Sequence, residues 1–259
     1  RGGGLFCWDA SNATGDRLPH SINHPRSIRM CEDDSSIISR IAEAKIGAIS
    51  LDKPELQEVY GSVYGEPELL CFNRKGNIWS YVDNNLIYVH NRGEKKPEQI
   101  PSPGAHQVEN LEISPQGDTL AIAWLGGIIG IQAARASNPD NRRLIRKSGP
   151  AVHAFAFSPN GECLAIADVT GQVEVWDIPK LQLRWSARIG SVSSVAWSPD
   201  ATILAAGEYH GDIILFKDGE LLTTWHSESG ETLTLCFGLL GEYLYSGHKN
   251  TTVLKWAVP

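Results

Sequence analysis

A short basic run is the part of this 259-residue sequence whose side chains could bind a charged ligand. Arg142, Arg143, Arg146 and Lys147 lie together just before Gly149-Pro150. Arginine and lysine pair with phosphates and carboxylates, so the run indicates contact with an RNA backbone or an acidic protein partner. Arginines that alternate with other residues are also typical of an outer β-strand whose charged side chains are solvated. The residues alone leave both interpretations open.

Trp124 is a second candidate contact residue. It stands next to Leu125-Gly126-Gly127, a stretch typical of a turn. An exposed tryptophan on a turn would anchor a protein partner, whereas a buried one would pack between neighbouring sheets. Both placements are compatible with the sequence.

Catalytic motifs are missing from the sequence. It contains no glycine-rich phosphate loop, no His-Glu-x-x-His and no Gly-x-Ser-x-Gly. The eight histidines are scattered without metal-ligand spacing. We therefore expect no catalytic residue, no cofactor and no metal site, and a protein that is not an enzyme.

Charge and cysteine content indicate in which cellular compartment the protein occurs and which classes of partner it binds. The formal net charge of -7 and the pI near 5.6 exclude a global basic field, so any RNA contact would be local. Five cysteines occur singly, without a Cys-x-x-Cys pair, which predicts small buried side chains in a reducing compartment. The sequence contains no run of about 18 apolar residues, and we expect no leader peptide. We expect an intracellular protein of the nucleus, nucleolus or cytoplasm that does not bind membranes.

A repeat organises the chain. Val152–Phe157, Glu162–Ala167 and Gln172–Asp177 are short apolar or alternating runs separated by turn signals, the pattern of three antiparallel strands joined by hairpins. Similar sets, spaced by about forty residues, begin at the following positions: Val108, Ser194 and Leu233. A repeat of this period predicts a propeller or a solenoid.

With the dipeptides Trp176-Asp177 and Trp8-Asp9, the repeat resembles the WD-repeat family of β-propellers. The resemblance implies an all-β fold of four-stranded antiparallel blades. In well-matched members an aspartate in the turn between the second and third strands joins a buried hydrogen-bond network. That turn position carries other residues here: Gly126, Thr170, His210 and Asn250. The departure predicts that these repeats depend more on apolar packing and hairpin geometry.

Counting third strands gives seven, which predicts a seven-bladed propeller. They begin at Leu5, Ile46, Leu86, Ile128, Val173, Ile213 and Val253. The two inner strands that should precede Leu5 are missing, so one blade is incomplete, and upstream sequence or a partner would supply them. The alternative is a six-bladed ring in which the N-terminal segment closes the last blade.

We expect a single domain over residues 1–259. Its predicted parts are an incomplete blade over 1–25 and repeats over about 26–60, 61–104, 105–148, 149–189, 190–226 and 227–259. Within this division, residues 93–104 read as a surface connection.

The predicted function is a non-catalytic protein-protein interaction scaffold in a larger intracellular assembly. The last repeats, with Trp225-His226, Gly241–Gly247 and Val253–Trp256, resemble nucleolar WD-repeat subunits of the small-subunit processome. That resemblance implies a ribonucleoprotein or ribosome-biogenesis complex. Two alternatives remain open: an actin-interacting WD-repeat protein that acts with cofilin, and a propeller enzyme with a site in the central channel.

Overall fold

The computed structural model describes most of the chain. Strands within residues 4–62 are described by their backbone alone, apart from the side chain of Ile46. The segments 69–100, 106–135 and 142–259 are described with their side chains. None of the described residues forms a helix long and apolar enough to span a membrane.

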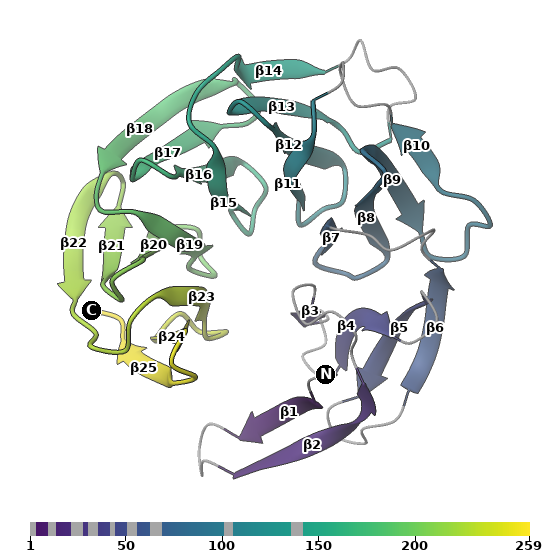
Figure 1. Ribbon diagram of the computed structural model, residues 1–259, viewed down its shortest axis with the longest axis horizontal. Coiled ribbons are helices and arrows are strands. Elements are labelled where there is room, and N and C mark those ends of the chain that lie inside the picture. Colours follow the sequence, from purple (N-terminus) through teal and green to yellow (C-terminus); the bar gives the residue numbers. More distant parts are fainter. Residues whose placement is uncertain are drawn as a thin grey trace. The chain divides into compact units, whose positions relative to one another are not determined.

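The chain divides into two compact units. Unit 1 contains residues 1–106, 116–120 and 133–141, and unit 2 contains residues 107–115, 121–132 and 142–259. Both are built of antiparallel sheets with neighbouring strands in sequence order (Figure 1).

Unit 1 contains three sheets. A two-stranded sheet is formed by β1 (Gly4–Asp9) and β2 (Thr14–Ser21). A four-stranded sheet contains β3 (Ile28–Met30), β4 (Ser36–Ile41), β5 (Lys45–Ser50) and β6 (Leu56–Ser62). The next contains β7 (Leu69–Phe72), β8 (Ile78–Asp83), β9 (Leu86–Asn91) and β10 (Glu98–Ile100).

Unit 2 holds most of the next sheet, which consists of β11 (Val108–Ile113), β12 (Thr119–Trp124), β13 (Ile128–Ala133) and β14 (Arg143–Arg146). It continues with β15 (Val152–Phe157), β16 (Cys163–Asp168), β17 (Gln172–Asp177) and β18 (Gln182–Arg188). A third sheet contains β19 (Val192–Trp197), β20 (Ile203–Glu208), β21 (Ile213–Lys217) and β22 (Glu220–Trp225). The last contains β23 (Thr232–Phe237), β24 (Tyr243–His248) and β25 (Val253–Ala257).

The turns explain why each hairpin closes where it does. Ser158 Oγ accepts a hydrogen bond from the Cys163 N–H at 2.9 Å, and Ser198 Oγ accepts one from Ile203 in the same way. Asn84 and Asn85 form the tight turn between β8 and β9 with φ of 48° and 63°, a left-handed conformation that asparagine tolerates. The serine and asparagine residues of the repeat therefore fix the ends of the strands.

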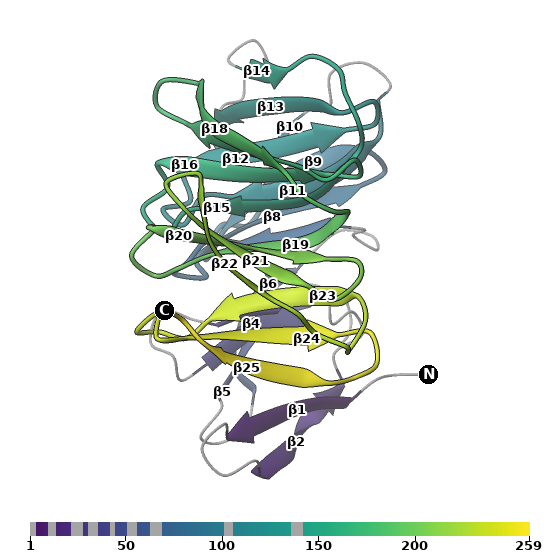
Figure 2. The ribbon, with the colours of Figure 1, turned by 90° about the vertical axis from the view of Figure 1, so that its left-hand side faces the viewer.

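Consecutive sheets of unit 2 pack face to face, with the first strands β15, β19 and β23 next to one another (Figures 1 and 2). Each interface joins small and branched side chains of one sheet to larger ones of the next. One such core contains Ala165 and Val175 against Leu204 and Phe216. Burial of these faces is the main favourable term in forming the stack.

Two expectations need correction. Residues 98–100, predicted as part of a surface connection, form β10, which pairs with β9, while 101–104 lie outside the described residues. Cys71 and Cys163 are buried as expected, but Cys236 is exposed, because no later sheet of unit 2 covers the outward face of β23. The side chains of Cys7, Trp8 and Cys31 lie outside the described part of the chain.

The sheet β1–β2 has two strands, and the predicted inner pair is not among its described strands. Completion of this sheet by upstream sequence or by a partner stays a prediction, as do the boundaries of the repeats within residues 1–259.

Candidate interaction surface

Arg142 points inward. Its guanidinium carbon lies 4.9 Å from the ring centroid of Trp124, and its Nε donates a hydrogen bond to Gln132 Oε1 at 2.9 Å. Burial lowers the pKa of Arg142 below its ordinary value. Trp124, the last residue of β12, is completely buried. Its side chain is therefore part of the protein interior and not an exposed anchor for a partner.

Arg146 also has internal partners. It donates hydrogen bonds to the Gly127 and Pro150 carbonyl oxygens at 2.9 and 2.8 Å and forms an ion pair of 3.3 Å with Asp168. Asp168 Oδ1 accepts further hydrogen bonds from the N–H and hydroxyl of Thr170. Because both charged side chains are largely buried, this group connects the sheet β11–β14 to the sheet β15–β18 and is structural.

Arg143 and Lys147 are the members of the basic run that lie exposed. The sequence suggested that four cations could hold a phosphate backbone, and the structure places two of them at the surface. Whether Arg143 and Lys147 contact a partner stays a prediction.

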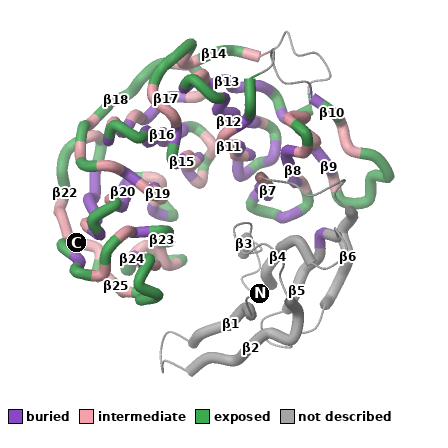
Figure 3. Tube along the Cα trace, viewed as in Figure 1, coloured by how far each residue is buried: buried purple, intermediate pink, exposed green. Residues whose placement is uncertain are grey.

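A different surface stands out on the last sheet of the chain. It carries several of the most exposed large hydrophobic side chains among the described residues, which lie in the turn before β24 and on the strands β23, β24 and β25. They are Leu233 (55% exposed), Leu239 (66%), Leu240 (84%), Tyr243 (38%) and Val253 (71%). Figure 3 shows exposed and half-buried stretches along these strands. Exposed apolar groups gathered on one element indicate an interaction site.

The turn between β23 and β24 differs chemically from its counterparts. In the two preceding sheets, the turn between the first and second strands begins with a serine and has a proline and one polar residue at its tip, as in Ser158–Gly161 and Ser198–Ala201. In Gly238–Gly241 the first residue is glycine and the tip is Leu239-Leu240. The backbone hydrogen bonds are retained, since Gly241 N–H donates to the Gly238 oxygen at 2.9 Å. This tight turn therefore exposes two leucine side chains to solvent.

The outward face of the last sheet differs as well. In the preceding sheet the corresponding positions, Ala205 and Leu215, are fully buried against β23–β25. In the last sheet these positions carry Tyr245 and Lys255, which face each other across β24 and β25. The Lys255 ammonium lies 3.9 Å from the ring centroid of Tyr243, a cation–π arrangement. This face combines aromatic and cationic groups and is exposed or half-buried.

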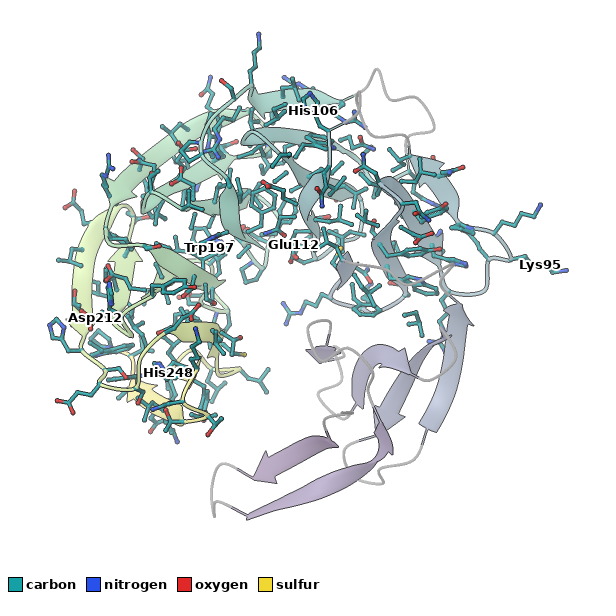
Figure 4. The ribbon with its side chains drawn as sticks, viewed as in Figure 1. Lys95, His106, Glu112, Trp197, Asp212 and His248 are labelled. Carbon is teal, nitrogen blue, oxygen red and sulfur yellow. The ribbon has the colours of Figure 1, made fainter. Side chains whose placement is uncertain are left out.

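Hydrogen bonds stiffen the opposite face of this sheet. Trp256 Nε1 donates to Ser246 Oγ at 2.8 Å, and Ser246 Oγ lies 2.8 Å from His248 Nε2. His248 Nδ1 lies 3.0 Å from the Gly230 oxygen, and the Trp256 ring stacks on Trp225. Figure 4 shows His248 on this sheet. The exposed leucines are therefore carried by a rigid support.

Sequence reasoning missed this network. It noted that the usual turn aspartate is missing and concluded that packing and hairpin geometry would dominate. The structure shows that His248, at the end of β24, links Ser246 to the loop before β23 instead. The recognisable signal for the exposed turn was Gly-Leu-Leu-Gly where the preceding repeats of unit 2 have Ser-Pro followed by a polar residue.

No group of three or more histidine, cysteine or acidic side chains that could hold a metal ion occurs among the residues described with side chains. The histidines with resolved contacts bond to backbone or side-chain partners, such as His153 with the Val192 oxygen and His226 with Asp212.

Two segments of the chain match a known protein-family model. The family model described as WD domain, G-beta repeat, matches residues 138–177 and 182–217. In solved structures, the β-propeller domain of Cps50 (Swd1) from Myceliophteria thermophila aligns with a TM-score of 0.79 at 14% identity, over 99% of this chain and 91% of that chain. This similarity establishes the fold.

Curated relatives are similar at low identity. Ribosome biogenesis protein erb1 of Botryotinia fuckeliana is 34% identical over 45% of this chain and 16% of its own length. Telomerase protein component 1 of Mus musculus is 22% identical over 98% of this chain and 10% of its own length. Actin-interacting protein 1-2 of Arabidopsis thaliana is 20% identical over 51% of this chain and 22% of its own length. The chain thus spans no more than about a quarter of these relatives.

Proposed function

Since the chain carries WD repeats in a β-propeller fold, we propose that it is a protein-protein interaction scaffold within a larger assembly. Rigid sheets present short turns at their ends, and such turns form recognition surfaces without a cost for ordering them. The proposal assigns binding, and no chemical step, to the described residues.

The turn Gly238–Gly241 is the observation that carries this proposal. Leu240 is 84% exposed and Leu239 66% exposed, and leaving a leucine in water instead of burying it costs about 2 kcal/mol. The other turns of unit 2 show that the fold does not require apolar residues at this place. A partner with an apolar pocket would bury both side chains and recover that free energy.

Replacement of both leucines tests the proposal. The tagged full chain and the L239S/L240S variant would be purified under native conditions, and co-purified proteins compared by quantitative mass spectrometry. We expect the variant to lose at least one stoichiometric partner. Because Leu221-Leu222 on β22 form another exposed pair, L221S/L222S is the matched control and should retain that partner.

Two outcomes contradict the proposal. One is a wild-type chain that purifies alone under these conditions. The other is loss of partners to the same extent in both variants, which would attribute binding to general surface hydrophobicity instead of the Gly238–Gly241 turn.

A ribonucleoprotein assembly of the nucleus or nucleolus is the finer proposal, and the similarity to ribosome biogenesis protein erb1 supports it. We expect the tagged chain to sediment with pre-ribosomal particles in a sucrose gradient and to concentrate in the nucleolus. A partner set of actin and cofilin, the alternative supported by the similarity to actin-interacting protein 1-2, would replace this finer proposal and leave the scaffold function intact.

A further inference from the structure

Unit 1 contains a second concentration of cations, separate from the run at 142–147. The turn between β7 and β8 carries Arg74 and Lys75, and the turn between β9 and β10 carries Arg92, Lys95 and Lys96. All five are exposed. They lie in a chain whose formal net charge is -7, so this local charge opposes that of the protein as a whole.

Strand order brings the two turns to the same end of one sheet. β7 and β9 run toward these turns and β8 and β10 run away from them, in the sheet order β10-β9-β8-β7. The Arg92 N–H donates to the Asn77 oxygen at 2.8 Å and ties the turns together. Neighbouring strands lie about 4.8 Å apart, which separates the two hairpin turns by roughly 10 Å.

Acidic groups also lie near this end, and two of them have partners. Asp118 follows Gly117, which lies close to Asn73, and accepts a hydrogen bond from the Thr119 hydroxyl at 3.0 Å. Glu94 accepts hydrogen bonds from Asn91 Nδ2 and from the Arg135 guanidinium, which adds another cation of unit 1 to the cluster. The hydrogen bond from Asn91 is the main reason why the pKa of Glu94 lies below its ordinary value. Glu98, at the start of β10, is half-buried. Lys95 projects away from the ribbon in Figure 4.

The surroundings favour a phosphate backbone over a protein partner. None of the exposed large hydrophobic side chains of the described chain lies within residues 69–100. Protein interfaces need an apolar, desolvated core, whereas binding to a nucleic acid backbone comes mainly from neutralised phosphates and released counterions. Flexible lysines and arginines at the tips of two turns suit the second kind of binding.

We propose that the basic turns formed by residues 73–77 and 91–97 bind the phosphodiester backbone of a nucleic acid. The contact is independent of base sequence, since it neutralises phosphates and reads no base edge. It is separate from the Gly238–Gly241 turn and does not rest on the scaffold proposal, so the two surfaces can fail independently.

Fluorescence anisotropy with the full chain tests this proposal. The probes are labelled 20-nucleotide oligouridylate RNA and oligothymidylate DNA, titrated at salt concentrations between 50 and 200 mM. We expect both probes to bind with comparable affinity and with a steep dependence on salt. The variant R74Q/K75Q/K95Q/K96Q should bind at least about tenfold more weakly at 50 mM salt. Its slope of log K against log salt should fall by up to about 2.8, which is about 0.7 for each of four lost contacts.

The matched control removes the same number of exposed cations from unit 2. In K180Q/R184Q/R188Q/K217Q the net charge changes equally, and all four side chains are exposed. We expect this control to bind nearly as the wild type. The variant R74Q/K75Q/K95Q/K96Q should retain the wild-type melting temperature because each change lies at the surface, whereas the control should melt slightly lower because Lys180 and Arg184 form ion pairs with the buried Asp177.

Three results would overturn the assignment. They are no measurable binding of either probe at 50 mM salt, an equal loss of binding in the control, and equal competition by a 20-residue polyglutamate. The last result would show an acidic peptide to be as good a ligand as a phosphodiester backbone. Preferential binding of one probe that still depends on Arg74, Lys75, Lys95 and Lys96 supports the proposal. It also shows whether the preferred nucleic acid is RNA or DNA.

Discussion

The sheets β19–β22 and β23–β25 have the same strand pairing over their first three strands, but the outward face of the first is buried and that of the second is exposed. In each, the first strand contains a bulge near its start, between Val192 and Ser194 and between Thr232 and Thr234. Leu204 is paired with Phe216 in one sheet, and Leu244 with Trp256 in the other. The same ladder therefore supports both a buried face and an exposed one.

Side chains at two positions make the difference. Ala205 and Leu215 let the next sheet approach closely, whereas Tyr245 and Lys255 fill the same positions in the last sheet with bulk and charge. A lysine in the centre of such an interface would need a partner carboxylate or a route to water. The comparison teaches that packing against a following sheet depends on a few side chains on a common backbone.

Exchange of those residues should produce the largest effect. Leu215→Lys places an ammonium at a position with no exposure, and we expect the free energy of unfolding to fall by at least about 3 kcal/mol. Lys255→Leu removes a charge from an exposed position and should change stability by less than about 0.5 kcal/mol. Urea unfolding followed by tryptophan fluorescence measures both.

Equal destabilisation by the two substitutions would contradict the comparison, because it would mean that the outward face of β25 is as tightly packed as that of β21. A second variant, Leu215→Met, conserves volume and should cost less than about 1.5 kcal/mol. It separates the effect of the charge from that of the changed shape.

The hydrogen-bonded face of the last sheet should give an intermediate effect. Ser246→Ala leaves Trp256 Nε1 and His248 Nε2 without their shared partner, and we expect a loss of about 2 kcal/mol from this buried group. In the preceding sheet the same two positions are Ala206 and Phe216, which need no such bond.

A double-mutant cycle sharpens this prediction. Trp256→Phe together with Ser246→Ala recreates the residues of the preceding sheet and removes both donor and acceptor. We therefore expect the double variant to be more stable than the sum of the single losses predicts. Strict additivity would show that the indole, the hydroxyl and the imidazole do not act as a network.

The repeats could be predicted from local patterns because hairpin signals are local. Val152–Phe157 and Gln172–Asp177 are the bounds of β15 and β17 as the alternation predicts. The outer strand β22 was not predicted, since its exposed leucines follow no alternation that marks one face. β10 was hidden because its short run follows a proline-containing turn.

Side-chain partners could not be predicted in the same way. Trp124 is completely buried, and one of the side chains that covers its ring is Arg142, eighteen positions later in the sequence. Arg146 is not available to a partner because it forms an ion pair with Asp168 of the next sheet. The cations Arg74 and Lys75 meet Lys95 and Lys96 only through the strand order. These are tertiary contacts between residues far apart in the chain. A single sequence shows the residue types but not these contacts.

The smallest predicted effect compares the two turns directly. Ser198 Oγ donates to Asp200 Oδ1 at 2.5 Å, and this bond is the main reason why the pKa of Asp200 lies below its ordinary value of 3.8. A lowered pKa in the folded state means that the carboxylate stabilises the fold above pH 3.8 and that this contribution disappears as the pH falls below it. Asp200→Asn should therefore reduce the melting temperature slightly at pH 7, and the difference from the wild type should shrink as the pH falls below 3.8. At the matching position of the last sheet, Leu240→Asp lacks the serine hydroxyl because Gly238 precedes it. Its melting temperature should consequently depend less on pH in this range, and an equal dependence would show that the serine does not set the charge state of the turn.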